Sequence, residues 1–197
     1  PGGQLDRFFS PLPLRYPTWG VQPPKYVNQD DIYKLLEDSC KALGIDWGPV
    51  KADIINTKNG PKIIEVTPRF HGDVSTSFVC NHSYEISPIK QWFEWLSNEK
   101  LPKKNLFADH KNISGWAGIF AKKIGKLKNI TGLKTLKEIP NFNGYLIRRN
   151  QGSEIYSIRD NTAIIGFVFA TGSSYSEVQK SLTSIIKNIH VEIEEKK

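Results

Sequence analysis

Apolar residues recur with two different periods along this chain, and the periods predict where helices and strands lie. Between Gln29 and Leu43 the apolar residues follow helical spacing, acids open the segment and Gly44 follows it, which predicts an amphipathic helix. A second helix is predicted from Ser87, which caps it, with Pro88 in the first helical position. We expect the buried face of that helix to consist of Ile89, Trp92, Phe93 and Leu96.

The last predicted helix begins at Ser174, where Ser174 and Glu177 have the spacing of a capping box. Its apolar stripe is expected to comprise Val178, Leu182, Ile185, Ile186 and Ile189. The proline-rich, aromatic segment 1–28 instead predicts an irregular but packed connection.

Short apolar runs bounded by turn residues predict strands. Two of them, about Val50–Ile55 and Lys62–Thr67, flank Thr57–Gly60, which is a hairpin signal. Four further strands are expected at Ile113–Ala121, Gly144–Arg149, Glu154–Ile158 and Ala163–Ala170. The fold class is therefore α+β, with antiparallel sheets and covering helices. A charged, proline-containing stretch at 98–104 predicts two domains, residues 1–104 and 105–197.

The register of the predicted hairpin decides which acidic side chains meet, because side chains alternate faces along a strand. A two-residue Asn59–Gly60 turn places Asp53 and Glu65 on opposite faces. A three-residue loop pairs Thr57 with Pro61 and brings Asp53 directly across from Glu65, with Thr67 on the same face. Both registers are open on the residues alone.

Two carboxylates directly opposite one another repel, so a fold that retains them usually places a cation between them. Magnesium prefers carboxylate oxygens and completes its coordination with water and phosphate. If the strand continues, Arg69 follows on the same face and offers a planar fork of donors to a phosphate. Two acids, a metal and an arginine are what phosphoryl transfer requires. The alternative is a plain surface ion pair between Glu65 and Arg69.

The stretches Ala42–Asp53 and Gly60–Arg69 together resemble the final third of an ATP-grasp domain. Members of that superfamily include carboxylate–amine ligases, amino-acid ligases, biotin carboxylase and carbamoyl-phosphate synthase. They carry a helix ending in a leucine–glycine pair, a strand with an acid, and a strand with a glutamate followed by an arginine. The resemblance covers roughly Asp6 to Leu96. More weakly, Gly115–Ala121 and Gly166–Gly172 are similar to the small domain that follows ATP-grasp in such proteins.

The resemblance implies an ATP- and Mg²⁺-binding site. It implies that Asp53 and Glu65 hold Mg²⁺ against the ATP phosphates, with Thr67 as a third metal ligand. It also implies that Arg69 is the catalytic residue, in contact with the transferring phosphoryl group or with the acyl phosphate. Many members have glutamate at position 53 and asparagine at position 67, and threonine is a poorer ligand than asparagine. The resemblance also places His71 and Gly72 in a loop near the acceptor substrate, where His71 is a candidate base; the alternative is a solvent-facing histidine.

Composition and charge limit the other possibilities. The hydrophobic content of 39% suits a globular chain, and no apolar run is long enough to cross a membrane. We expect Cys40 to be reduced and buried, which fits a cytoplasmic protein; a disulfide is the alternative. The net charge of +7 lies mainly between Lys100 and Asn150, but the lysines are scattered without a nucleic-acid motif, so a solvated basic face is favoured over a nucleic-acid interface.

The function expected from the resemblance is an ATP-dependent ligase that activates a carboxylate as an acyl phosphate for attack by an amine, releasing ADP and phosphate. The chain begins Pro1–Gln4 and contains no methionine, so we expect it to be a fragment whose partner is the N-terminal half of the same enzyme, and inactive by itself. The alternative function is a non-catalytic ATP-grasp remnant that binds a polyanion or assembles with a protein. The carboxylate, the amine and a homo-oligomeric state are left open.

Overall fold

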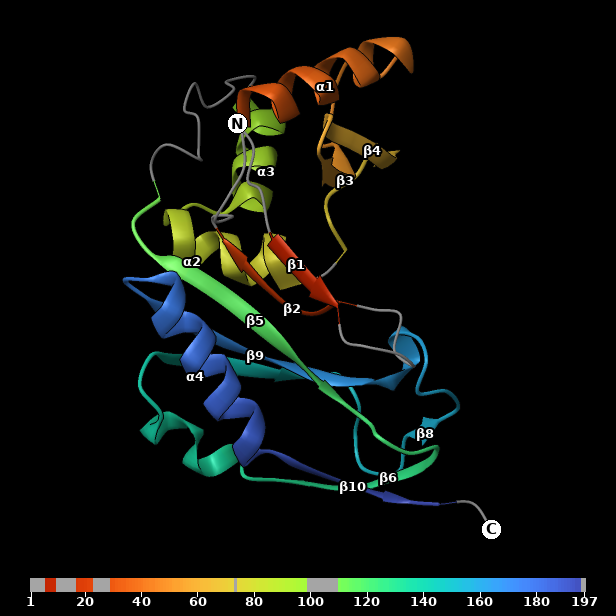
Figure 1. Ribbon diagram of the computed structural model, residues 1–197, viewed down its shortest axis with the longest axis vertical. Helices are drawn as coiled ribbons and strands as arrows, with labels where there is room; N and C mark the ends of the chain where they lie inside the picture. Colours follow the sequence, from red (N-terminus) through yellow and green to blue (C-terminus); the bar gives the residue numbers. More distant parts are fainter. Residues whose placement is uncertain (1–5, 10–16, 23–28, 73, 99–109, 196–197) are drawn as a thin grey trace.

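The computed structural model describes residues 6–9, 17–22, 29–72, 74–98 and 110–195. A five-stranded antiparallel sheet lies at the centre of this structure (Figure 1). Its strands, in spatial order, are β1 (Asp6–Phe9), β2 (Pro17–Gln22), β5 (Ile113–Phe120), β9 (Ile164–Gly172) and β7 (Phe142–Ile147).

Both faces of the central sheet are covered. Helix α4 (Tyr175–Asn188) packs on one face, above a core cluster that includes Val168, Val178 and Ile185. The other face carries a π-helical segment, Ser75–Val79, which leads directly into α2 (Cys80–Tyr84). A three-stranded sheet adds to the α4 side, in the order β10 (His190–Glu194), β6 (Gly125–Thr131) and β8 (Glu154–Ile155).

The apolar run of β9 is continuous because the strand is buried on both sides. Phe167 and Phe169 face the π-helical segment, whereas Val168 and Ala170 face α4. Two 3₁₀ turns, Leu133–Glu138 and Asn161–Ala163, complete the connections in this half of the molecule.

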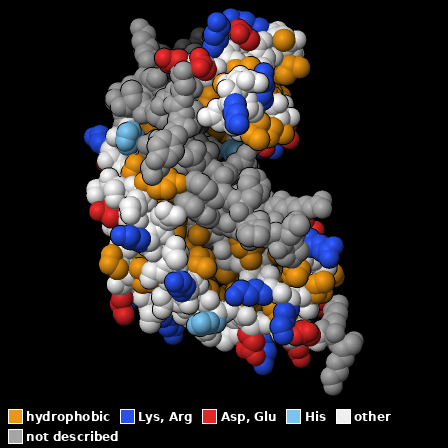
Figure 2. Space-filling view, viewed as in Figure 1, with side chains coloured by type: hydrophobic (Ala, Val, Ile, Leu, Met, Phe, Trp, Pro, Cys, Tyr) orange, Lys and Arg blue, Asp and Glu red, His pale blue; other side chains and the backbone are white. Residues whose placement is uncertain are grey.

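The other end of the molecule contains α1 (Gln29–Ala42), α3 (Pro88–Asn98) and a separate hairpin of β3 (Lys51–Thr57) and β4 (Gly60–Thr67) (Figure 1). An aromatic cluster links the loop after α1 to α3. In it, the ring centroid of Trp92 lies 6.0 Å from that of Trp47, 4.6 Å from that of Trp95 and 6.4 Å from that of Phe70. Hydrophobic side chains reach the surface over this end (Figure 2).

Most predicted elements are present, and the α+β fold class with antiparallel sheets is confirmed. Ser87 Oγ accepts from Lys90 N at 3.3 Å and Ser174 Oγ accepts from Glu177 N at 3.3 Å, so both predicted helix starts are correct. On α4, Val178, Leu182 and Ile185 are buried as predicted.

Two expectations about the elements were wrong, and two strands were missed. Phe93 and Leu96 are exposed, because α3 turns its tryptophans toward Trp47 instead. The segment 1–28 contains two strands, β1 and β2; β2 starts with Pro17, a position where a strand does not need the missing N–H. Strands β6 and β10 were missed, although β6 alternates buried Leu127 with exposed lysines.

Both cysteines are free, as expected of Cys40. The expectation that Cys40 is buried was wrong: its side chain is partly exposed, and Cys80 is the buried cysteine. The boundary predicted near residue 104 lies outside the described residues, and the division into two domains stays a prediction. The central sheet joins β1 and β2 from one side of that boundary to β5, β7 and β9 from the other. Within the described part of the chain, no helix combines the length and apolarity that a bilayer crossing needs.

Candidate functional site

The β3–β4 hairpin is closed by a two-residue turn, Lys58–Asn59. Thr57 Oγ1 accepts from Asn59 N at 3.1 Å and donates to Gly60 O at 2.7 Å, which ties the turn to the strand ends. Gly60 has a φ of +87°, a conformation that glycine adopts without strain. The turn is therefore specified by local chemistry.

The register pairs Asp53 with Glu65, as one of the two predicted hairpins required. The route differs from both predictions. Thr57 pairs with Gly60, and the register then shifts between Ile54, which pairs with Ile63, and Asp53. Ile64 is thus an extra residue in β4, a bulge, and its side chain is exposed. Because one extra residue reverses the parity of a strand, the bulge places both carboxylates on the same face.

Lys51 lies between these two carboxylates. Its Nζ is 2.8 Å from Asp53 Oδ2 and 3.0 Å from Glu65 Oε1. The Lys51 side chain is only 9% exposed, compared with 23% for Asp53 and 52% for Glu65. Thr67, which pairs with Lys51 across the hairpin, donates its hydroxyl hydrogen to the same Glu65 Oε1 at 2.7 Å. The four side chains form one polar cluster on one face of the hairpin.

The electrostatics of the cluster favour an ionised glutamate. The hydrogen bond from Thr67 and then the hydrogen bond and charge of Lys51 lower the pKa of Glu65 below its usual range. The carboxylate is therefore charged at neutral pH, the state in which it holds a cation.

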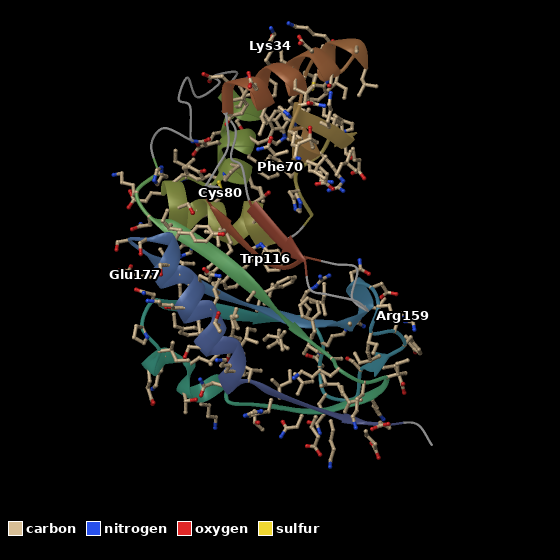
Figure 3. The ribbon with its side chains drawn as sticks, viewed as in Figure 1. Lys34, Phe70, Cys80, Trp116, Arg159 and Glu177 are labelled. Carbon is tan, nitrogen blue, oxygen red and sulfur yellow. The ribbon has the colours of Figure 1, made fainter. Side chains whose placement is uncertain are left out.

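Arg69 lies just beyond the hairpin. The strand ends at Thr67, as predicted, because Pro68 has no N–H and Arg69 N turns back to Thr67 O at 2.9 Å. The condition that would have placed Arg69 on the face of Glu65, a strand continuing beyond Thr67, is therefore not met. Arg69 is exposed, and its Nη1 donates to Phe70 O at 2.9 Å. A Cβ built on Gly72 would be 3.5 Å from Arg69 Nη1, so the loop passes directly beside the guanidinium. Figure 3 shows Phe70 on the segment between the hairpin and the central sheet.

His71 follows in the same loop and is half-buried, with its Nε2 atom buried. The alternative of a fully solvent-facing histidine is therefore not supported. The role of His71 as a base stays a prediction. Five residues of π-helix follow almost immediately, a conformation that is frequent near functional sites.

The donor set of this cluster suits a hard cation. Asp53 and Glu65 already direct oxygens at a single positive charge, that of Lys51. No group of three or more His, Cys, Asp or Glu side chains that could hold a metal is found among the described residues. Magnesium, however, commonly uses only one or two carboxylates and takes its remaining ligands from water and phosphate. Whether Asp53, Glu65 and Thr67 bind metal stays a prediction.

Residues 118–194 match the sequence family described as L-amino acid ligase C-terminal domain 2. The structure of an L-amino acid ligase from Bacillus licheniformis superimposes with a TM-score of 0.78 over 91% of this chain, at 19% sequence identity. The chain has the fold of the C-terminal part of an ATP-grasp ligase. This confirms the resemblance that was based on Ala42–Asp53 and Gly60–Arg69.

Two further proteins are similar to this chain. The biotin carboxylase domain of 2-oxoglutarate carboxylase from Hydrogenobacter thermophilus, solved in complex with MgADP, ADP and bicarbonate, superimposes with a TM-score of 0.62 at 13% identity over 91% of this chain. A curated relative, uncharacterized protein y4rH of Sinorhizobium fredii, is 25% identical over 155 residues, 79% of this chain.

All of these relatives are longer than this chain. It covers 45% of the L-amino acid ligase structure, 40% of the carboxylase structure and 32% of the Sinorhizobium protein. Activity is therefore a property to be proposed for the whole protein.

Sequence reasoning missed Lys51 as a member of the site. The signal was present, since Lys51 stands two residues before Asp53 and so shares its face on a regular strand. Attention to the acids alone left out the positive charge that lies between them.

Proposed function

We propose that the protein carrying this chain is an ATP- and Mg²⁺-dependent ligase that joins a carboxylate to an amine and releases ADP and phosphate. The observation that carries the proposal is the pair of opposed carboxylates, Asp53 and Glu65, with the ammonium group of Lys51 held between them. The fold likeness to an L-amino acid ligase makes amino acids the first substrate class to test.

The proposed reaction has two steps. The γ-phosphoryl group of ATP passes to a carboxylate oxygen of the substrate, giving an acyl phosphate and ADP. The amine nitrogen then attacks the acyl carbon and loses its proton, and phosphate leaves as the amide bond forms. Magnesium would supply charge neutralisation at the phosphates.

Each site residue has a role in this scheme. Asp53 and Glu65 would hold the metal, with Thr67 orienting Glu65 through their 2.7 Å hydrogen bond or acting as a further ligand. Arg69, exposed beyond the end of β4, would offer guanidinium donors to the phosphoryl group during its transfer. His71 and Gly72, next in the loop, would lie toward the acceptor substrate.

The test is ADP release by the full-length protein with Mg²⁺ and ATP across a panel of amino acids and small carboxylates. We expect substrate-dependent release, and a loss of roughly 100-fold or more in Asp53→Ala and Glu65→Ala, because each removes charge from the metal site. Glu192→Ala is the matched control: Glu192 also pairs with a lysine, Lys128 at 2.7 Å, but in the three-stranded sheet.

ADP release that ignores both substitutions, or is absent from the folded full-length protein with every substrate, would contradict the ligase. The residues 1–197 assayed alone are expected to release no ADP, since the fold likeness covers less than half of the L-amino acid ligase structure.

The alternative of a basic binding module gains no specific support. Several lysines of the basic segment are engaged with glutamates: Lys111 with Glu85, Lys123 with Glu195 and Lys128 with Glu192. Polyanion binding would also weaken steeply with salt, whereas metal-dependent nucleotide binding would require Mg²⁺.

A further inference from the structure

Lys51 raises a question that the proposed ligase activity does not answer. Its ammonium sits where a metal shared by Asp53 and Glu65 would place its charge, within 3.0 Å of an oxygen from each. An ammonium and a divalent metal cannot occupy the same position, and an ammonium has no lone pair with which to coordinate a metal.

We propose that Lys51 is a resident counter-ion that keeps a divalent metal out of this site until nucleotide arrives, so that metal and nucleotide bind together. The inference rests on the proposed Mg–ATP function and deepens it. It assigns a positioning role, because Lys51 acts through the two carboxylates.

The burial of the three side chains supports this assignment. In the other lysine–glutamate pairs of the described residues both side chains are well exposed. In Lys128–Glu192, for example, the exposed fractions of the two side chains are 58% and 56%. Lys51 is instead the most buried of the three charged side chains, and contacts two acids from two different strands. A charge that is largely withdrawn from water needs such partners, so the three charges are bound as a unit.

The strand geometry gives the lysine no alternative face. Lys51 and Asp53 are two residues apart on β3, and Asp53 pairs directly with Glu65 across the hairpin. All three side chains therefore point to the same side. A lone metal entering here must displace the ammonium and leave it close to a second positive charge, which opposes binding.

Bound nucleotide alters the balance of charge around Lys51. A metal–triphosphate complex brings oxygens of high negative charge, and the four-carbon stem of lysine lets its ammonium swing from the carboxylates to a phosphate. The displaced charge then gains a partner. Free metal should bind weakly, nucleotide should strengthen metal binding, and by linkage metal should strengthen nucleotide binding by the same factor.

The experiment measures Mn²⁺ binding to the full-length protein by electron paramagnetic resonance, with and without a non-hydrolysable ATP analogue. Removing the ammonium in Lys51→Met should tighten binding of free Mn²⁺ by about tenfold or more, and should reduce the enhancement given by nucleotide. Lys51→Arg keeps the charge and should behave as wild type. Lys128→Met is the matched control and should change neither quantity.

Three other outcomes are distinguishable. Wild-type protein that binds Mn²⁺ only with nucleotide, while Lys51→Met binds free Mn²⁺ no more tightly, would overturn the counter-ion role and leave the ligase proposal standing. Absence of Mn²⁺ binding to every folded variant, even with nucleotide, would overturn both. If Lys51→Met does not fold, Lys51→Gln keeps a polar group without charge and carries the same expectation of tighter free-metal binding.

Discussion

Large side chains are buried on both faces of the central sheet, whereas around the β3–β4 hairpin several of them lie at the surface. Phe167 on β9 is 1% exposed, and Phe93 on α3 is 62% exposed. The central sheet has α4 on one side and the π-helical segment on the other, but the hairpin is a two-stranded sheet against α1. A two-stranded hairpin is marginal by itself, so this region depends on added packing.

This difference in burial indicates that one region of the molecule provides stability and the other carries the candidate site. The core around the central sheet holds the fold together, and the charged cluster of Lys51, Asp53 and Glu65 lies on the hairpin, whose residues are half-buried or exposed. Register in the hairpin is consequently specified by its turn, its bulge and its ion pairs more than by an apolar face.

Matched phenylalanine substitutions should separate the two regions most strongly. Phe167→Ala should lower the free energy of unfolding by about 3–5 kcal/mol, because it removes a buried ring that meets Trp116 edge to face at 5.4 Å. Phe93→Ala should change it by less than about 1 kcal/mol. Urea unfolding of purified residues 1–197 measures both, and equal losses would show that the hairpin end is as well packed as the core.

Two glycines with the same backbone angle provide a second comparison. Gly60 in the hairpin and Gly132 beside α4 both have a φ of +87°. A Cβ on Gly132 would lie 1.8 Å from the backbone oxygen of Asn188, whereas one on Gly60 would meet nothing within 4 Å. Gly60→Ala should therefore cost only the strain of a left-handed residue, about 1–2 kcal/mol, and Gly132→Ala clearly more. A similar shift in the thermal midpoint for both variants would contradict the tight packing at Asn188.

Two exposed glutamates should differ in their response to pH and salt. The hydrogen bonds from Ser173 Oγ and N lower the pKa of Glu177 at the start of α4, and Lys41 lowers the pKa of Glu37 on α1. Since both folded pKa values lie below the unfolded value of about 4.3, each stabilisation is present above that pH and is lost as the pH falls through the lowered value.

Urea midpoints of Glu177→Gln and Glu37→Gln should thus fall below wild type near pH 7 and converge with it in acid. Salt of roughly 1 M, with a Debye length of about 3 Å, should remove the effect of Glu37 but leave much of that of Glu177. The reason is that Glu177 accepts from neutral Ser173 at 2.8 and 3.0 Å, whereas Glu37 is paired with a lysine. Equal salt sensitivity would contradict this assignment.

The sequence predicted helices correctly where the spacing of apolar residues or a capping residue marked them. The helical spacing of Val178, Leu182 and Ile185 predicted which side of α4 is buried, and the serine–proline start predicted where α3 begins. The same reasoning failed for Phe93 and Leu96. Helical periodicity identifies an apolar stripe, but only the position of Trp47 shows which part of that stripe the rest of the chain covers.

The candidate site divides in the same way. A hairpin, two acids near its middle and an arginine after its end could all be predicted from the sequence, because turns and strand alternation are properties of neighbouring residues. The bulge at Ile64 that brings Asp53 opposite Glu65, and the position of Lys51 between them, could be seen only in the folded chain. The same holds for the pairing of β2, far earlier in the sequence, with β5 in the central sheet. These are contacts between residues distant along the chain, and their energies exist only once the strands have been brought together.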